Sequence, residues 1–293
     1  SDNFLGPAFS ANEQAAIAET TVVNNDNIDD ETYGTNGEGG NNTTDRIFLL
    51  SIEETDNKDY FPQFSSSRYS TNTAYVADGG RLGTYMNGED SDYLDNWWLR
   101  SPGSNNTMAA FIEEDGGDVY EGNPVDDESA AVRPAFNLDL SSVRFTSAAT
   151  GGKSSGTDTG LTAVADYTGN EWKLTLLDSS RNFAVSDETW SGNTLTFSYS
   201  NAQTGANEYI SAVIEDSGVI THYGRILQPT SESGTASLSL PDGVTLSDTT
   251  KLYVFNEQYN GDYKTDYASP LQRISPAAPQ APSITTTTLL GGK

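Results

Sequence analysis

The 293-residue sequence has no cysteine and a single histidine, His222. The absence of cysteine excludes disulfide bonds, thiol nucleophiles, iron–sulfur clusters and zinc sites built from thiolates. With one histidine there is no multi-histidine metal centre, and a Ser-His-Asp triad would depend on His222 alone. Because His222 lies in the alternating run of residues 220–225, we interpret it as a side chain on the surface of a strand.

Basic residues are also scarce, since 15 Lys and Arg stand against 42 Asp and Glu for a net charge of −27. Nucleic-acid binding is excluded because it needs Lys and Arg to displace the counterions of the phosphates. Anionic membrane surfaces are disfavoured for the same reason, and no apolar run is long enough for direct membrane insertion. The acidity instead predicts a basic or polar partner whose association weakens with salt.

The length suggests two domains, and the charge divides the chain in the same way. Residues 1–150 carry 7 basic and 27 acidic residues (7 − 27 = −20), and residues 151–293 carry 8 and 15 (8 − 15 = −7). A small, polar segment between them is typical of a flexible linker. The predicted organisation is a domain over 1–145, a linker over 146–160, a second domain over 161–275, and a proline-rich spacer over 276–293 that leads into a further domain.

Two helices are expected in the first domain. Ser10–Glu13 and Ser51–Glu54 both have the Ser-x-x-Glu spacing of a capping box, and an acidic, Gly- and Asn-rich loop lies between them. The rest is expected to form short strands, at residues 47–50, 96–99, 108–112, 118–120 and 131–138.

The second domain is predicted to be all-β. Several of its apolar segments alternate with period two, and Gly-containing turns separate them. Six or seven short strands in a domain of this size favour an immunoglobulin-like sandwich. The strand candidates are residues 173–177, 193–199, 209–214, 219–227, 235–240 and 251–255.

Two motifs make the first domain distinctive, Trp97-Trp-Leu-Arg-Ser-Pro-Gly103 and Val132-Arg-Pro-Ala-Phe-Asn-Leu138. With the upstream segment Asp45–Glu54, they resemble a domain of Firmicutes surface proteins whose relatives adopt the C-type-lectin-like fold. The resemblance covers residues 8–145 and implies an α+β C-type-lectin-like domain. Formylglycine-generating enzymes share that fold but use paired cysteines, so their activity is not carried over. No enzymatic activity and no catalytic residue are expected.

The second domain resembles the immunoglobulin-like module that follows such domains, through residues 172–178, 207–214, 223–225 and 251–262. Residues 282–292 are similar to the first strand of another tandem repeat. The resemblance implies an extracellular stalk that carries a binding head and is attached to the cell surface. The signal peptide and the anchor would then lie outside this sequence.

Four residues of the two motifs are expected to be structural. Trp97 and Trp98 would line a core strand, because each indole can bury a large area. Arg100 and Arg133 stand among apolar or small residues, and a guanidinium in such a place pairs with an internal carboxylate or carbonyl and fixes a loop. The alternative is that these arginines bind an anionic ligand.

The segment between the motifs is the candidate recognition surface, because the resemblance implies that the corresponding stretch contacts ligand. It combines amide and acidic side chains with one aromatic side chain on short loops. Ordinary solvated loops are the alternative interpretation. The candidate ligand-binding residues are Asn105, Asn106, Tyr120, Asn123, Asp126, Asp127 and Glu128.

No cofactor is expected, although calcium stays open because it binds oxygen ligands and needs neither Cys nor His. The candidate metal ligands are Asp90, Asp92 and Asp95, and a second acidic cluster spans residues 26–31. Neither cluster has the fixed glycine and terminal glutamate of a helix-loop-helix calcium site. The alternative is that both clusters are solvated loop charge.

These features together predict a non-enzymatic surface adhesion protein. Its head would recognise a protein or glycan of a host or of a neighbouring microbe. Two alternatives remain, a purely structural surface spacer and a calcium-dependent glycan-binding lectin. A flexible linker at 146–160 would favour a head that presents itself to a ligand, and tightly packed domains would favour a spacer.

Overall fold

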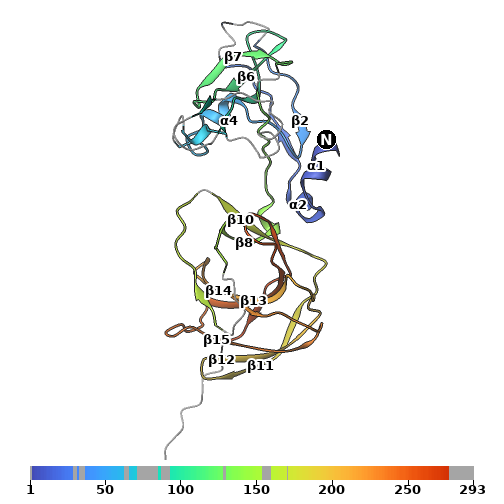
Figure 1. Cartoon of the computed structure of the whole chain (residues 1–293), viewed down its shortest axis with the longest axis vertical. Coiled ribbons are helices and arrows are strands. Elements are labelled where there is room, and N and C mark those ends of the chain that lie inside the picture. The colour runs from blue at the N-terminus through green and yellow to red at the C-terminus, as the bar shows by residue number, and fades with distance from the viewer. Residues whose placement is uncertain are drawn as a thin grey trace, which may run out of the picture. The chain divides into compact units, whose positions relative to one another are not determined.

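A computed structural model describes residues 2–28, 32, 37–62, 66–70, 85–86, 93–127, 130–153, 160–169 and 171–276. The chain divides into two compact units, Ser1–Asp139 and Leu140–Lys293 (Figure 1). Unit 2 includes a strand over Val143–Ala148, so the first residues of the predicted linker lie in a sheet. The predicted spacer falls outside the described residues from position 277 onward.

Unit 1 consists of short elements. Its helices are α1 (Asp2–Ala8), α2 (Ala11–Ala16), α4 (Ile52–Asp56) and the 3-10 turn η2 (Ser66–Arg68). Its strands are β1 (Thr20–Val22), β2 (Thr43–Asp45), β3 (Tyr85–Met86), β4 (Tyr93–Leu94), β5 (Trp97–Pro102), β6 (Met108–Ile112) and β7 (Asp118–Pro124). β1 pairs with β2, β3 pairs with β4, and β5, β6 and β7 form an antiparallel sheet. Among the described residues, no helix is long and apolar enough to cross a membrane.

Both predicted capping boxes are confirmed. The hydroxyl of Ser10 accepts the N–H of Glu13, whose carboxylate accepts the N–H of Ser10 in return. Ser51 and Glu54 repeat this pair of bonds at the start of α4. The helices nevertheless end within two turns, because the backbone at both C-caps is already extended.

The core of unit 1 is built around β5. Trp97 and Leu99 are buried on one face of this strand and pack with Ile52 of α4 and Ile112 of β6. Trp98 points to the other face, where its ring meets Phe111 edge to face at 6.0 Å between centroids. The six residues of β5 therefore alternate between a buried and a half-buried face, as a period-two strand does.

The α+β C-type-lectin-like fold predicted for unit 1 is wrong. The structure is mostly β, with few and short helices and small separate sheets. The segment that carries the second motif pairs only through isolated bridges at Ala131, Ala135 and Leu138. Pro134 interrupts it, and proline cannot donate a hydrogen bond to a strand ladder.

Unit 2 contains an eight-stranded and a three-stranded sheet. The eight-stranded sheet runs in the order β8-β10-β17-β16-β13-β14-β9, with β18 added on β16, and the other in the order β11-β12-β15. The six predicted strands are confirmed, whereas β8, β9, β11, β17 and β18 were not predicted. The elements are η3 (Leu140–Ser142), β8 (Val143–Ala148), β9 (Thr162–Ala163), β10 (Trp172–Leu177), β11 (Ala184–Ser191), β12 (Thr194–Ser200), β13 (Glu208–Asp216), β14 (Val219–Leu227), β15 (Gly234–Ser239), β16 (Thr250–Gln258), β17 (Asp266–Ala268) and β18 (Gln272–Ile274).

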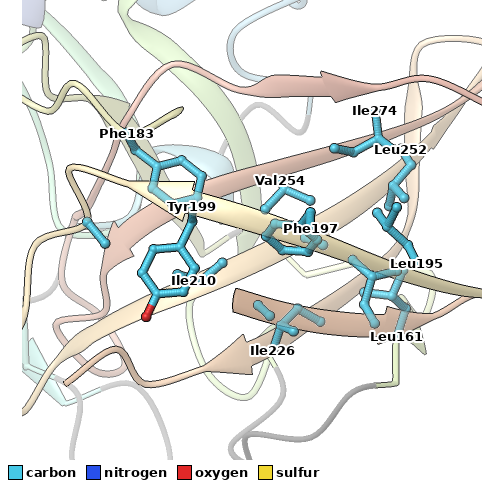
Figure 2. Packing of buried hydrophobic residues seen from close by; sticks show 14 of the residues in the cluster. Leu161, Phe183, Leu195, Phe197, Tyr199, Ile210, Ile226, Leu252, Val254 and Ile274 are labelled. Atoms are coloured by element: carbon cyan, nitrogen blue, oxygen red, sulfur yellow. The ribbon is translucent and has the colours of Figure 1, made fainter. Parts of the chain in front are cut away.

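Two cores lie on opposite faces of the large sheet. On one face, Phe197 and Leu195 of β12 pack against Ile210 of β13 and Val254 of β16 (Figure 2). On the other face, Val213, Tyr223, Phe255 and Ala268 form a second buried cluster. Strands β13 and β16 thus contribute neighbouring residues to both cores, which is the pattern of central strands covered on both sides.

The immunoglobulin-like sandwich predicted for unit 2 is not supported. Such a sandwich has two antiparallel sheets over one core. Here the large sheet curls, and it includes a parallel pair, β10 with β17. The period-two pattern identified strands correctly, but it could not show that β8 and β17 join the same sheet from the two ends of the unit.

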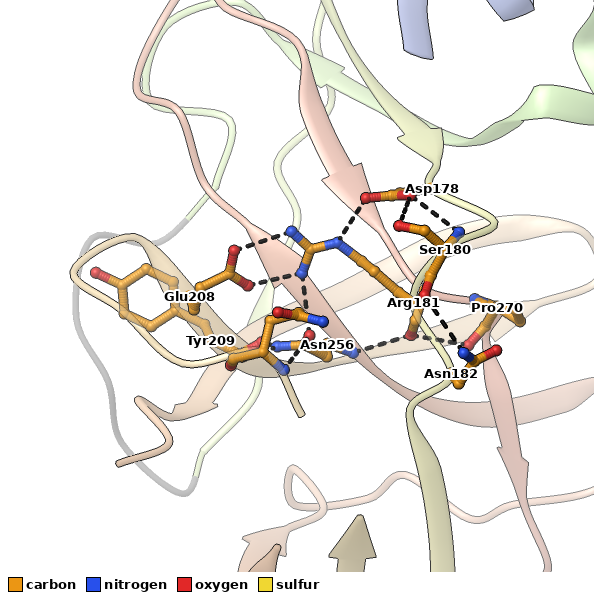
Figure 3. A network of polar contacts seen from close by, with 10 residues as sticks. Asp178, Ser180, Arg181, Asn182, Glu208, Tyr209, Asn256 and Pro270 are labelled. Carbon is orange, nitrogen blue, oxygen red and sulfur yellow. Dashed lines mark hydrogen bonds and ion pairs between the residues drawn. The ribbon is translucent and has the colours of Figure 1, made fainter. Parts of the chain in front are cut away.

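A buried arginine ties the loop between β10 and β11 to the large sheet (Figure 3). Arg181 donates to both carboxylate oxygens of Glu208, at 2.6 and 2.9 Å, and to Oδ1 of Asn256 at 3.0 Å. Its Nε lies 3.2 Å from Asp178. Burial lowers the pKa of Arg181, but the bonds and charge of Glu208 and Asp178 outweigh it and leave the pKa raised.

Candidate functional site

A loop over residues 23–28 forms one wall of the candidate site in unit 1. Asn27 anchors it, because its buried amide donates to the carbonyls of Pro102 at 2.7 Å and Tyr120 at 2.9 Å. Its backbone N–H donates to Gly37 O at 2.7 Å. With Asn27 turned inward, the neighbouring side chains of Asp26 and Ile28 are exposed.

This loop, the start of α4 and the end of β5 line an open cavity of about 570 Å³, which we call the acidic cavity. Its walls combine carboxylates, amides and hydroxyls with two isoleucines, and the described residues that line it include no Lys, Arg or His. The lining residues are Asn25, Asp26, Ile28, Ser51, Ile52, Glu53, Asp56, Asn57 and Ser101.

The carboxylates of the acidic cavity are only partly neutralised. Asp26 accepts the N–H of Gly39 at 2.7 Å, and Glu53 accepts a hydrogen bond from the amide of Asn25. Asp56 lies 2.8 Å from the guanidinium of Arg68. Within the part of the chain that the structure describes, Asp26 and Glu53 have no ion pair with a basic side chain. The cavity therefore offers negative charge and hydrogen-bond acceptors to a cationic group.

The buried Arg68 pairs with Asp56, which lines the acidic cavity. Arg68 is 1% exposed, donates twice to the carbonyl of Thr55, and pairs with Asp118 at 2.5 Å as well as with Asp56. Burial raises the pKa of Asp118, although the hydrogen bond and charge of Arg68 oppose this. Burial, together with the charges of Asp118 and Asp56, also raises the pKa of Tyr120 to about 12.

Two of the four predicted structural residues, Trp97 and Arg133, contact this arginine. The indole N–H of Trp97 donates to the carbonyl of Arg68 at 3.0 Å, and Arg133 donates to the same carbonyl at 3.2 Å. The Arg133 guanidinium lies 4.7 Å from the Trp97 ring centroid, and burial lowers its pKa.

Arg100 binds groups of its own chain. Its guanidinium donates to the carbonyls of Leu49 at 2.7 Å and Val23 at 3.1 and 3.2 Å, and it lies 2.5 Å from the carboxylate of Glu54. These bonds connect three segments that are far apart in the sequence. They also fix the backbone on either side of the acidic cavity.

Five of the predicted ligand-binding residues lie together at one end of the β5-β6-β7 sheet, which we call the hairpin tip. Val125 N–H donates to Thr107 O at 2.9 Å, which joins the two segments that carry them. Oδ1 of Asn105 accepts the N–H and the hydroxyl of Thr107, whereas Asn106 and Asp126 are exposed. The five residues are Asn105, Asn106, Asn123, Asp126 and Asp127.

The other predicted site residues are not at the hairpin tip. Tyr120 is half-buried against the core of unit 1, and its hydroxyl donates to Asp56 at 3.4 Å. Glu128 and the metal candidates Asp90 and Asp92 lie outside the described residues. Asp95 is buried, and its carboxylate accepts the N–H of Asn96 at 3.1 Å. Among the residues that the structure describes, no group of three or more metal-binding side chains is present.

A second, more apolar cavity of about 760 Å³ lies elsewhere on unit 1. Phe4, Phe48 and Val132 contribute to its walls, and Phe4 and Val132 are exposed on the surface. The polar side chains at its edge, Glu19 and Arg46, lie 3.8 Å apart and compensate each other. Asp45 also lines this cavity and has no ion pair among the described residues, so the cavity carries one uncompensated carboxylate.

Sequence patterns indicate one part of the acidic cavity but not the rest. Asp26 belongs to the acidic cluster that was considered for calcium, but Asn25, Glu53, Asp56 and Asn57 were not singled out. The capping box at Ser51 was the available signal, because it places acidic residues in the first turn of a helix. What it could not indicate is that residues 25–28 lie opposite that turn.

Residues 1–140 match a family described as a domain of unknown function, DUF6273, so the match covers unit 1. The description assigns no activity to that family. No curated protein and no solved structure matches the chain.

Proposed function

We propose that the chain is a non-enzymatic binding protein that acts outside the cell, with unit 1 as its binding unit. The acidic cavity is the ligand-binding site, and it takes a Lys or Arg side chain presented by a partner protein. The polar composition, rich in Gly, Ser, Thr and Asn, supports an extracellular location. Unit 2 serves as the supporting module.

The observation that carries the proposal is the uncompensated charge of the cavity. Asp26 and Glu53 line it, and no basic residue is among the described residues that line it. The exposed side chain of Ile28 supplies apolar surface for the stem of a long basic side chain. The net charge of residues 1–139 is 6 − 27 = −21, which draws cationic partners toward unit 1. Carboxylate–guanidinium bonds are among the stronger hydrogen bonds.

Binding of a fluorescein-labelled tetra-arginine peptide to the full chain tests the proposal. The matched probe is tetra-citrulline, which keeps the shape of arginine but has no charge. We expect the double variant Asp26→Asn, Glu53→Gln to bind tetra-arginine about fivefold more weakly, because both carboxylates are exposed and each exposed ion pair contributes roughly 0.5 kcal/mol.

Two controls separate a site from general attraction to an acidic chain. Glu232→Gln with Asp242→Asn removes the same charge from exposed positions of unit 2 and is expected to change affinity by less than twofold. Asn106→Ala with Asp126→Ala tests the hairpin tip. Equal weakening by all three double variants, or weakening by the hairpin-tip variant alone, would contradict the proposed site.

Calcium binding at Asp90, Asp92 and Asp95 stays a prediction. It is tested by the melting temperature of the full chain in calcium and in EDTA, because a ligand of the folded state raises that temperature. A melting temperature that is the same in both conditions would contradict calcium binding at these residues. It would leave the proposed binding of a basic side chain in the acidic cavity unchanged.

A further inference from the structure

Unit 2 buries a lysine between two carboxylates. The Nζ of Lys153 lies 2.6 Å from Oε2 of Glu257 and 2.6 Å from Oδ2 of Asp266. The side chain of Lys153 is 2% exposed, and those of Glu257 and Asp266 are fully buried. No step of the proposed binding function uses these three groups.

The fold brings these residues together from distant parts of the unit. Glu257 lies on β16 and Asp266 begins β17, while Lys153 follows a tight turn after β8. Gly152 permits the turn, because a Cβ at this position would lie 2.6 Å from the backbone of Ala148. Lys153 and Asp266 are separated by 113 positions in the sequence.

Aromatic side chains surround the lysine. Its Nζ lies 4.9 Å from the ring centroid of Phe145 and 5.5 Å from that of Tyr223, and Phe255 packs on Phe145. Bringing separate charges into such surroundings costs several kcal/mol per ion. A reaction that replaces the ammonium and the carboxylate by a neutral amide removes both buried charges.

The two oxygens of Asp266 have different partners. Oδ2 faces Lys153, whereas Oδ1 accepts the N–H of Asn260 at 2.8 Å and lies 2.9 Å from Nζ of Lys173. Two donors at Oδ1 are placed where negative charge develops when a nucleophile attacks the carboxyl carbon. Oδ2 can then accept two protons and leave as water.

Glu257 is in turn oriented for proton transfer. Its Oε1 accepts the hydroxyl of Tyr223 at 2.5 Å, so Oε2 remains directed at Lys153. Burial would raise the pKa of Glu257, but the charge of Lys153 and the hydrogen bonds of Lys153 and Tyr223 hold the pKa below its usual range. The lowered pKa keeps Glu257 ionised, and its Oε2, at 2.6 Å from Nζ of Lys153, is close enough to accept a proton from the ammonium.

We propose that Lys153 and Asp266 condense to an intramolecular isopeptide bond, with Glu257 as the proton carrier. Glu257 removes a proton from the Lys153 ammonium, and the neutral amine attacks Cγ of Asp266. The N–C bond forms, two protons from the former ammonium reach Oδ2, and the Cγ–Oδ2 bond breaks to release one water. Nothing is oxidised or reduced, and Glu257 ends as a carboxylate.

Lys173 is not the reacting amine, although it also lies beside Asp266. It donates to Gly261 O at 2.6 Å and lies over the ring of Tyr259 at 4.0 Å, and its only carboxylate partner is Asp266 itself among the described ion pairs. Within the described part of the chain, no second carboxylate lies at ion-pair distance from its Nζ to take its proton. Its role is to stabilise charge on Oδ1.

The intact mass of the full-length chain under denaturing conditions tests the proposal. The isopeptide predicts a mass lower than the sequence mass by one water molecule, and tandem mass spectrometry of a tryptic digest should find a branched peptide that joins Lys153 to Asp266. A chain that has the full sequence mass would overturn the proposal.

Variants distinguish this bond from other losses of water, such as succinimide formation at the Asp115–Gly116 step. Lys153→Ala and Glu257→Gln should restore the full sequence mass. Asp266→Asn should lose one ammonia instead of one water, because the Lys153 amine then attacks a carboxamide whose leaving group is ammonia. Lys251→Gln alters a half-buried lysine that pairs with Glu215 and should keep the loss of water. Persistence of the loss in Lys153→Ala would overturn the proposal.

Discussion

Replacing Arg68 by alanine should destabilise unit 1 more than any substitution at its surface. The guanidinium is 1% exposed and joins Asp56, Asp118 and the carbonyl of Thr55. Removing one partner of a buried ion pair costs about 3–5 kcal/mol, because the remaining charge is left without compensation. For a domain with roughly 5–15 kcal/mol of stability, this is a large fraction.

Urea unfolding followed by tryptophan fluorescence would measure this loss. The fluorescence of Trp97 should respond to the loss of structure around Arg68, since the Trp97 indole donates to the carbonyl of Arg68. The background Trp172→Phe, Trp190→Phe leaves only the two tryptophans of unit 1. At a slope of about 2 kcal/mol per molar urea, the unfolding midpoint should fall by roughly 2 M.

Arg46→Ala is the matched control. Its ion pair with Glu19 is long, at 3.8 Å, and exposed, so it should contribute about 1 kcal/mol or less. If Arg68→Ala leaves no folded unit 1, Asp118→Asn keeps the side-chain volume and should give a smaller but measurable loss. A loss below about 1 kcal/mol for both Arg68→Ala and Asp118→Asn would refute the reasoning.

Three further predictions concern packing, backbone geometry and pH. Phe197→Ala should lower the free energy of unfolding, measured with heat or urea, by about 3–5 kcal/mol, because Phe197 is fully buried. Val219→Ala, at an exposed position, should change it by no more than about 0.5 kcal/mol. Gly122→Ala should unfold the β6–β7 hairpin, as judged by amide hydrogen exchange, because Gly122 has φ +75° and its Cβ would meet the Ala109 carbonyl oxygen at 2.3 Å. In absorbance titration, the Tyr120 hydroxyl should ionise near pH 12. The stabilising contribution of the neutral hydroxyl is full below pH ~10, where tyrosine ionises in the unfolded chain, and is lost as the pH rises toward 12. Tyr120→Phe should therefore remove this part of the loss of stability at alkaline pH.

Local features of the fold could be predicted from the sequence. The capping boxes at Ser10 and Ser51 depend on residues three positions apart, and the six confirmed strands depend on a period-two pattern. The architecture could not be predicted in this way. That β17 pairs in parallel with β10, and that the large sheet is covered on both faces, follows from contacts between distant segments.

The candidate sites show the same division. Residues 25–28 and the first turn of α4 form one cavity only because Asn27 reaches Pro102 and Tyr120. Lys153 lies in a Gly- and Ser-rich stretch that is typical of a linker. No pattern near it in the sequence predicts its contacts with Glu257 and Asp266, which are more than 100 positions away. Composition indicated correctly that the chain is acidic, but not where its charge remains uncompensated.

Amide hydrogen exchange of the full chain, with and without the tetra-arginine peptide, tests the proposed binding site most directly. Binding in the acidic cavity predicts slower exchange in residues 23–28 and 51–57, with tetra-citrulline producing no change. Slower exchange confined to residues 104–107 and 123–127 at the hairpin tip, or no change anywhere in unit 1 at saturating peptide, would contradict the account.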